Sequence, residues 1–233
     1  RSISTKTHYV KFDWGIFARM MEVAIPSAIQ RSIVSIGMIC VQTLVNSYGE
    51  TVMAGYTAAT KIDSITIVPL TNIGNAISSF TAQNIGANKP ERIKKCYFAA
   101  ICMILIFCIA IAMVMFLFGS NLVGLFVDSN SEQAVIQVGV RYLRVVSMLY
   151  ALMGIMSSCN SILRGSGDVN FFMLCTLCNF TVRVAFAYGF TPILHEASIW
   201  WSIPTGWFIS SILANLRFFS GKWRTKSLIK QTE

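Results

Sequence analysis

The segment from Cys96 to Gly119 contains no charged residue and constrains the fold more than any other part of the chain. It reads CYFAAICMILIFCIAIAMVMFLFG. A helix needs about 20 mostly apolar residues to cross the hydrocarbon core of a bilayer, and this segment is long enough. In lipid the backbone hydrogen bonds must be satisfied within the protein, and a helix satisfies them within one segment. The segment therefore predicts a transmembrane helix.

Five further segments have the length and the apolar character of membrane-spanning helices. Together with the first they cover residues 23–46, 52–80, 96–119, 142–163, 171–194 and 199–219. Charged residues make up only 12% of the chain, whereas soluble domains carry about 25%. We therefore predict an all-α integral membrane protein with six transmembrane helices between residues 23 and 222. A cytoplasmic lead-in at 1–22 precedes them, and a basic cytoplasmic tail at 223–233 follows.

The basic residues gather on one side of these predicted helices. That side carries Arg1, Lys6, Lys11, Arg19, Lys89, Arg92, Lys94, Lys95, Arg164, Arg217, Lys222, Arg224, Lys226 and Lys230. The loops on the other side have no Lys or Arg apart from Arg141, which lies at the edge of the fourth predicted span. Lys and Arg are enriched in cytoplasmic loops, and they attract anionic lipid headgroups. We therefore predict a multi-pass protein of the cell membrane with both termini in the cytoplasm.

Other functional classes find little support in the sequence. The net charge of +9 does not indicate nucleic-acid binding, because long charge-free stretches separate the basic clusters. Cys175 and Cys178 form a C-x-x-C, but no second pair follows, and small thiols in a membrane helix are the simpler interpretation. The stretch GANKPE does not match a phosphate-binding loop, and no catalytic constellation is present. We predict no enzyme activity, no metal site and no cofactor.

The first predicted span carries a polar stripe. Arg31, Ser35, Met38 and Gln42 follow one another at helical spacing, and Gln30 lies beside them. Ionisable groups at membrane depth are costly, so they usually face a cavity, a partner or an ion path. The stripe is the wall of a cavity or a packing face in which Arg31 pairs with a neighbouring helix.

The second predicted span is the most polar of the six. Tyr56, Thr60 and Asp63 share a face, and Lys61 points roughly 200° away from Asp63 at 3.6 residues per turn. The two charges therefore cannot pair with each other, and each needs water, substrate or another helix. Asn72 lies farther along, between Pro69 and Gly74, where a bend could open backbone groups to a cavity. Interhelical salt bridges are the competing interpretation.

The fifth predicted span places Cys175, Asn179 and Arg183 at every fourth residue. An arginine within the bilayer must find acceptors, and Asn179 lies one turn before it. Arg183 lines a transport path or is a structural arginine tied to carbonyl groups at a helix interface.

Four stretches resemble the multidrug and toxic compound extrusion (MATE) transporters. QNIGANKPERIKK, with Gln83, Asn84, Gly86 and Arg92, is similar to an inner loop of that family, and LRGSGD is similar to a second one. FDWGIFARMMEVAIPSAIQRSIVSIG resembles the start of its seventh helix, and YTAATKIDSITIVPLTNIGNAISSF resembles its eighth. The resemblance extends from about Phe12 to Lys222.

The resemblance implies a chain that is one lobe of a twelve-helix transporter, helices seven to twelve. Family members exchange Na+ or H+ for organic, often cationic, compounds by alternating access. The partner is then a missing N-terminal six-helix lobe or a second half-transporter, and the ligand is a small organic substrate. Some Na+-coupled relatives carry a glutamate in the seventh helix, whereas this chain has Gln30 and Arg31 there.

Two other functions compete with export. A lipid-linked saccharide flippase of the same superfamily would need a wide cationic cavity, which the intramembrane arginines keep open. A non-transporting membrane scaffold is the other alternative, although unpaired charges at membrane depth would be costly in it.

Overall fold

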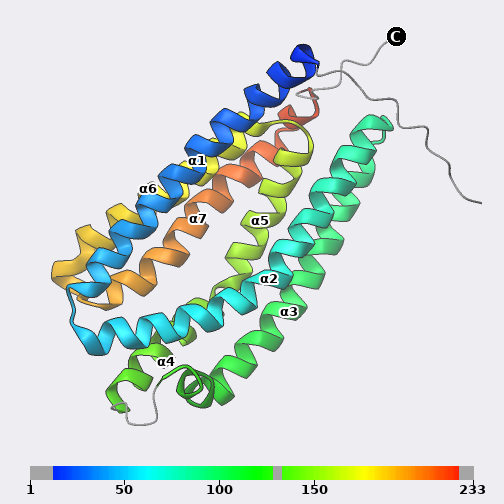
Figure 1. Cartoon of the computed structure of the whole chain (residues 1–233). Coiled ribbons are helices and arrows are strands. Elements are labelled where there is room, and N and C mark those ends of the chain that lie inside the picture. Colours follow the sequence, from blue (N-terminus) through cyan, green and yellow to red (C-terminus); the bar gives the residue numbers. More distant parts are fainter. Residues whose placement is uncertain (1–12, 128–132, 226–233) are drawn as a thin grey trace, which may run out of the picture.

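The computed structural model describes residues 13–127 and 133–225 and is helical throughout that part of the chain (Figure 1). Its elements are α1 Trp14–Asn46, α2 Glu50–Gly86, α3 Glu91–Gly124, α4 Gln133–Met148, α5 Tyr150–Gly165, α6 Val169–Leu194, α7 Ala197–Phe219 and the short 3-10 helix η1 Lys222–Thr225. The helices run up and down as one bundle. The start of α1, the α2–α3 turn, the α5–α6 turn and the end of α7 all lie at the same end (Figure 1).

The fourth predicted span is two helices in the structure. α4 and α5 meet at a break around Leu149, where their axes differ by 51°. At the break, the N–H of Leu149 donates to the carbonyl of Val146, three residues before it, at 3.1 Å. In a regular α-helix it would donate to the fourth residue before. With α4 and α5 taken as one bent span, the bundle has the six-span arrangement predicted from the sequence.

The six spans differ in polarity. In the described residues, Ala28–Asn46 of α1, α3 and α6 are apolar and long enough to cross a membrane, and the α4–α5 pair makes a fourth such span. α2 and α7 are 37 and 23 residues long and complete the six. α2 contributes Thr60, Asp63 and Ser64 to a cavity inside the bundle, and α7 buries several serines and tryptophans against its neighbours.

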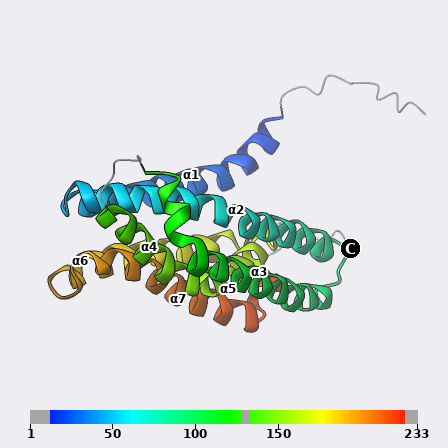
Figure 2. The ribbon, with the colours of Figure 1, turned by 90° about the horizontal axis from the view of Figure 1, so that it is seen from below.

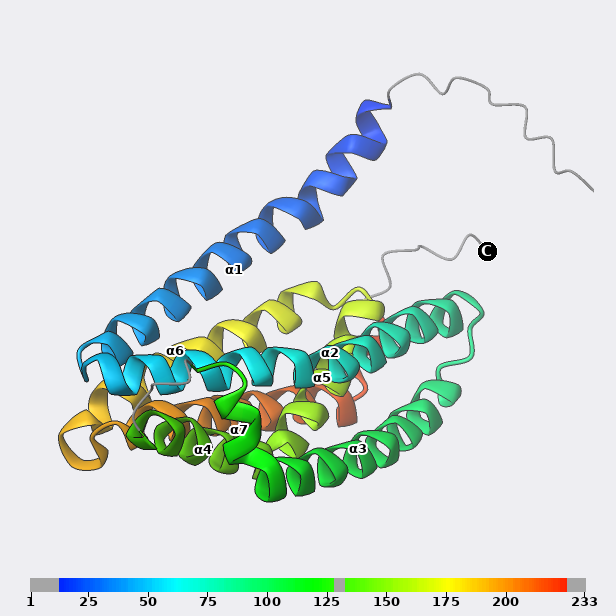
Figure 3. The same ribbon diagram turned by 60° about the horizontal axis from the view of Figure 1, so that its bottom comes forward.

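Helix packing leaves α1 as the least enclosed element. α7 packs against α6 and α5, and α2 packs against α4 and α5, whereas α1 contacts mainly α6. The N-terminal half of α1 diverges from the other helices (Figures 2 and 3). α2 continues through Pro69 as one helix and changes direction along its length (Figure 1).

The end of the bundle at which α7 finishes is closed by aromatic and ionic contacts. Trp223 of η1 is fully buried, stacks on Phe218 with ring centroids 5.8 Å apart, and donates its indole N–H to the Phe218 carbonyl at 2.8 Å. Arg217 donates to the buried carboxylate of Asp168 at 2.7 Å and lies over the ring of Phe171. Asp168, the last residue of the LRGSGD stretch, therefore fastens α7 to the start of α6.

Candidate functional site

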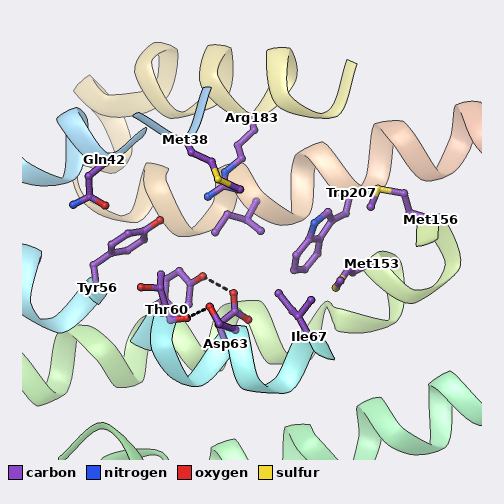
Figure 4. Close-up of a pocket in the computed structure, with 13 residues that line it drawn as sticks. Met38, Gln42, Tyr56, Thr60, Asp63, Ile67, Met153, Met156, Arg183 and Trp207 are labelled. Carbon is purple, nitrogen blue, oxygen red and sulfur yellow. Dashed lines mark hydrogen bonds between the residues drawn. The ribbon is translucent and has the colours of Figure 1, made fainter. Parts of the chain in front are cut away.

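A cavity of about 390 Å³ lies inside the bundle (Figure 4). Side chains from α1, α2, α6 and α7 line it, together with both halves of the bent α4–α5 span. Of the candidates predicted from the sequence, it brings together Gln42, Tyr56, Thr60, Asp63 and Arg183. The shared face predicted for the second span is thus a wall of the cavity.

Asp63 is held by two tyrosines that the sequence analysis did not select. Tyr142 of α4 donates its hydroxyl to one carboxylate oxygen at 3.1 Å, and Tyr150 of α5 donates to the other. The Asp63 residue is 9% exposed, and both tyrosines are buried. The break at Leu149 lies between the two tyrosines, so one carboxylate of α2 connects the two halves of the broken span. The spacing of eight residues, about two helical turns, was the only signal in the sequence.

Arg183 of α6 faces the same cavity from the opposite wall (Figure 4). It lies within electrostatic range of both Tyr56 and Asp63. Its Nε atom is buried and has no hydrogen-bond partner. Over residues 13–127 and 133–225 the ion pairs are Arg141–Glu196, Arg217–Asp168 and Arg224–Glu91, and neither Arg183 nor Asp63 takes part in one. The interhelical salt bridge considered for Asp63 is therefore not formed within the described part of the chain.

Aromatic rings and thioethers make up much of the remaining wall. The rings of Tyr56 and Tyr142 pack edge to face with their centroids 5.4 Å apart. The ring centroids of Trp207 and Tyr150 are 6.1 Å apart. Met38, Met153 and Met156 complete this surface. Ring faces and flexible thioethers adapt to flat organic molecules of varied shape. Of this surface, only Tyr56 and Met38 had been named from the sequence.

Several predicted candidates lie outside the cavity wall. Arg31, Lys61 and Asn72 are exposed, whereas Gln30 is buried. Asn179 is also buried, and it donates its side-chain amide to the sulfur of Met156 at 3.3 Å. The polar stripe of α1 therefore divides, with Met38 and Gln42 at the cavity and Arg31 away from it.

The predicted loop signature forms the tight turn between α2 and α3. Asn84 is buried and donates its side-chain amide to the Phe80 carbonyl at 2.8 Å, and its own carbonyl accepts from Lys89 at 2.8 Å. Gln83, Gly86 and Arg92 are exposed around this turn. The signature lies at the end of the bundle, away from the cavity.

A model of the family MatE matches residues 26–189. The chain belongs to the MatE family. This match confirms the predicted family and covers the helices that supply Asp63 and Arg183.

Relatives of the MatE family agree over nearly the whole chain. The probable multidrug resistance protein YpnP of Bacillus subtilis is 28% identical over 94% of this chain and 48% of its own length. The probable multidrug resistance protein NorM of Thermotoga maritima is 22% identical over 93% of this chain and 47% of its own length. The chain spans about half the length of the curated relatives it matches.

Solved structures share the fold. A MOP superfamily transporter from Pyrococcus furiosus, described by the reverse polarity of its binding pocket, superposes with a TM-score of 0.82 at 22% identity, over 92% of this chain and 49% of that one. An outward-facing multidrug resistance MATE family transporter gives a TM-score of 0.81 at 21% identity, with the same coverage. The predicted all-α membrane fold is confirmed, and the chain covers about half of each of these structures.

Proposed function

We propose that this chain is the C-terminal lobe of a membrane exporter of small organic compounds that carry a cationic group. The observation that carries the proposal is Asp63, a carboxylate held inside an aromatic cavity by two neutral tyrosine hydroxyls. A carboxylate without an ion-pair partner in the described residues attracts a cation, and the rings around it accommodate an apolar body.

The exporter works by alternating access and is coupled to Na+ or H+. In this mechanism two lobes rock around a central site, and the coupling ion and the substrate favour different states. Asp63 is the group at which they compete, because one carboxylate binds an organic cation, a proton or Na+ but not two of them fully at once. Thr60 and Ser64 line the same part of the cavity and supply further oxygen atoms.

A second six-helix lobe completes the transporter. The chain covers about half of its relatives, and α1 is only partly enclosed by the other helices. The complementary lobe is an N-terminal six-helix unit, and a second copy of this chain is the alternative. Expression of this chain by itself then gives no export. Export by this chain alone would favour a pair of identical half-transporters.

The termini lie in the cytoplasm of a cell with this protein in its plasma membrane. Lys89, Arg92, Lys94 and Lys95 follow the α2–α3 turn, at the same end of the bundle as Arg164 and Arg217. A cysteine introduced at Lys94 should react with a membrane-impermeant maleimide only after the cells are opened. Labelling in intact cells would reverse the orientation.

The flippase alternative is less well supported. It needs a cationic cavity, and of the two arginines considered, Arg183 lines the described cavity whereas Arg31 does not. Asp63 faces the same space, so the described wall carries both signs of charge.

Ethidium accumulation in cells that express the full-length protein tests the proposal. Cells with the native protein should accumulate less dye than cells with an empty vector, and collapse of the Na+ or proton gradient should abolish the difference. Asp63→Asn should raise accumulation to the vector level at an unchanged amount of protein in the membrane. Lys61→Gln, a change two residues away at an exposed position, is the control and should export normally. Full export by Asp63→Asn would remove Asp63 from the mechanism.

A further inference from the structure

α3 lies at one edge of the bundle, on the side of α2 that faces away from α1 (Figures 1 and 3). It packs against α2, α4 and α5 with a buried face that includes Ile93, Tyr97, Ala100 and Ile104. The structure describes all of Glu91–Gly124, and no residue of this helix lines the central cavity. The opposite face of α3 is therefore available to the lipid around the protein.

The outward face of α3 carries a row of exposed apolar side chains. Phe98, Leu105, Ile109 and Phe116 are 57%, 37%, 60% and 41% exposed. They follow one another at intervals of seven, four and seven residues, which places them on one face of the helix. At about 1.5 Å per residue the row is about 27 Å long, close to the thickness of a hydrocarbon core of about 30 Å. The row therefore matches the acyl-chain region of a bilayer.

Two lysines lie at the start of this row. Lys94 and Lys95 come four and three residues before Phe98, so they lie on the same face, one turn closer to the α2–α3 turn. Both lysines are exposed. The charge-free residues 96–119 follow them directly, and a lysine at the end of such a stretch extends its ammonium group into the headgroup layer. The two cations therefore lie at the boundary of the hydrocarbon core.

These lysines are not neutralised by a carboxylate of the described residues. Between residues 64 and 127 the sequence contains one acidic residue, Glu91. The guanidinium of Arg224 in η1 pairs with the Glu91 carboxylate at 3.3 Å. The ion pairs of residues 13–127 and 133–225 include neither Lys94 nor Lys95. The start of α3 is therefore cationic, and the acidic side chain nearest to it in the sequence is already engaged.

A lysine pair next to an apolar row suits an amphiphile with an anionic head. Lysines at a membrane boundary attract anionic headgroups. An acyl chain of one leaflet spans half of the core, about 15 Å, and Phe98 and Ile109 are about 16 Å apart along α3. A free phosphate would contact the lysines alone, whereas a phospholipid also covers the row.

We propose that the start of α3 binds an anionic glycerophospholipid, with its phosphate at Lys94 and Lys95 and an acyl chain against Phe98 and Ile109. The site lies outside the central cavity and does not depend on the proposed export function. It differs from a general attraction of basic loops to the membrane, because it assigns the contact to one face of one helix.

Two lipids with the same acyl chains provide a matched test. Dioleoylphosphatidylglycerol has a negative headgroup, and dioleoylphosphatidylcholine is zwitterionic. Lipid binding to the purified full-length protein in detergent is measured by native mass spectrometry. The first phosphatidylglycerol should bind about tenfold more tightly than the first phosphatidylcholine, as expected for two cations near a headgroup. Excess inorganic phosphate, an anion without chains, should not displace it.

Substitutions assign the preference to the lysine pair. The double variant Lys94→Gln, Lys95→Gln should bind the two lipids equally. Lys94→Arg with Lys95→Arg keeps the charge and should keep the preference, which guards against an effect of misfolding. Arg31→Gln with Lys61→Gln removes the same net charge at exposed positions of α1 and α2 and is the control. This control should bind both lipids like the native protein.

Three results would overturn the proposal. The first is equal binding of the two lipids to the native protein. The second is a preference for phosphatidylglycerol that survives in Lys94→Gln, Lys95→Gln or is lost equally in the charge-matched control. The third is displacement of the lipid by inorganic phosphate, which would identify a site for a free anion. None of these results bears on the proposed export, which rests on Asp63.

Discussion

The contact of Asp63 with Tyr142 and Tyr150 gives a quantitative prediction about stability. Tyr142 and Tyr150 are 1% and 0% exposed, so water cannot replace the carboxylate as their partner. Replacement of either tyrosine by Phe removes one hydroxyl and preserves the ring contacts with Tyr56, Trp200 and Trp207. A hydrogen bond to a charged group contributes about 1.5–3 kcal/mol. We therefore expect Tyr150→Phe to lower the free energy of unfolding by about 2 kcal/mol.

A double-mutant cycle isolates the contact from other effects of the substitutions. In the cycle Tyr150→Phe is combined with Asp63→Leu, and unfolding is followed by tryptophan fluorescence in mixed micelles of SDS and a mild detergent. Contacting residues couple by about 0.5–3 kcal/mol, whereas distant ones are additive within about 0.5 kcal/mol. We expect a coupling of about 1.5 kcal/mol between Asp63 and Tyr150, and a similar one between Asp63 and Tyr142.

A distant tyrosine supplies the control for this cycle. Tyr97 donates its hydroxyl to Asn215 at 2.8 Å, in the apolar cluster closed by Trp223. Tyr97→Phe should therefore be additive with Asp63→Leu. Additivity of Asp63→Leu with both Tyr142→Phe and Tyr150→Phe would show that the carboxylate does not hold the broken span, and the reasoning about the site would be wrong.

Three further predictions concern the packing and the end of the bundle at which α7 finishes. A methyl group at Gly165 would lie 2.3 Å from a backbone oxygen of α2, so Gly165→Ala should cost about 1–3 kcal/mol of stability. Gly189→Ala, with open space around it, is the control and should be neutral or stabilising. Equal melting temperatures of the two variants would contradict this prediction. Asp168→Ala leaves the partly buried Arg217 without its partner and should cost about 3 kcal/mol in detergent unfolding, and a loss under 0.5 kcal/mol would mean that the pair is solvated. Trp223→Ala should cost about 3–5 kcal/mol and Trp223→Phe less, because the stacking is retained; an equal effect of the two would refute the role of the ring.

The bent span shows where sequence reasoning reached its limit. Residues 142–163 were predicted as one helix, and the break at Leu149 has neither Gly nor Pro beside it to signal a change of direction. Pro69, which does signal one, lies inside α2, which is unbroken but changes direction along its length (Figure 1). The position of a break depends on what the neighbouring helices hold in place, and in this bundle Asp63 of α2 holds a tyrosine on each side of it.

The cavity was predicted in part. Gln42, Tyr56, Thr60, Asp63 and Arg183 were selected because polar and charged side chains at membrane depth are costly and must face something. The same reasoning selected Arg31 and Lys61, which are exposed outside the cavity wall. The free-energy cost of a charge at membrane depth identifies a residue that needs a partner. It does not say on which side of the helix that partner lies.

The sequence by itself determined the family, the number and order of the spans, and the end of the bundle at which the cations gather. These properties follow from hydropathy, loop charge and short motifs, and each is local along the chain. The tertiary structure alone decided that Asp63 is bound by tyrosines from two halves of one span and that Arg183 faces it without pairing. Both depend on how helices far apart in sequence are rotated against each other, which is fixed by the packing of the whole bundle.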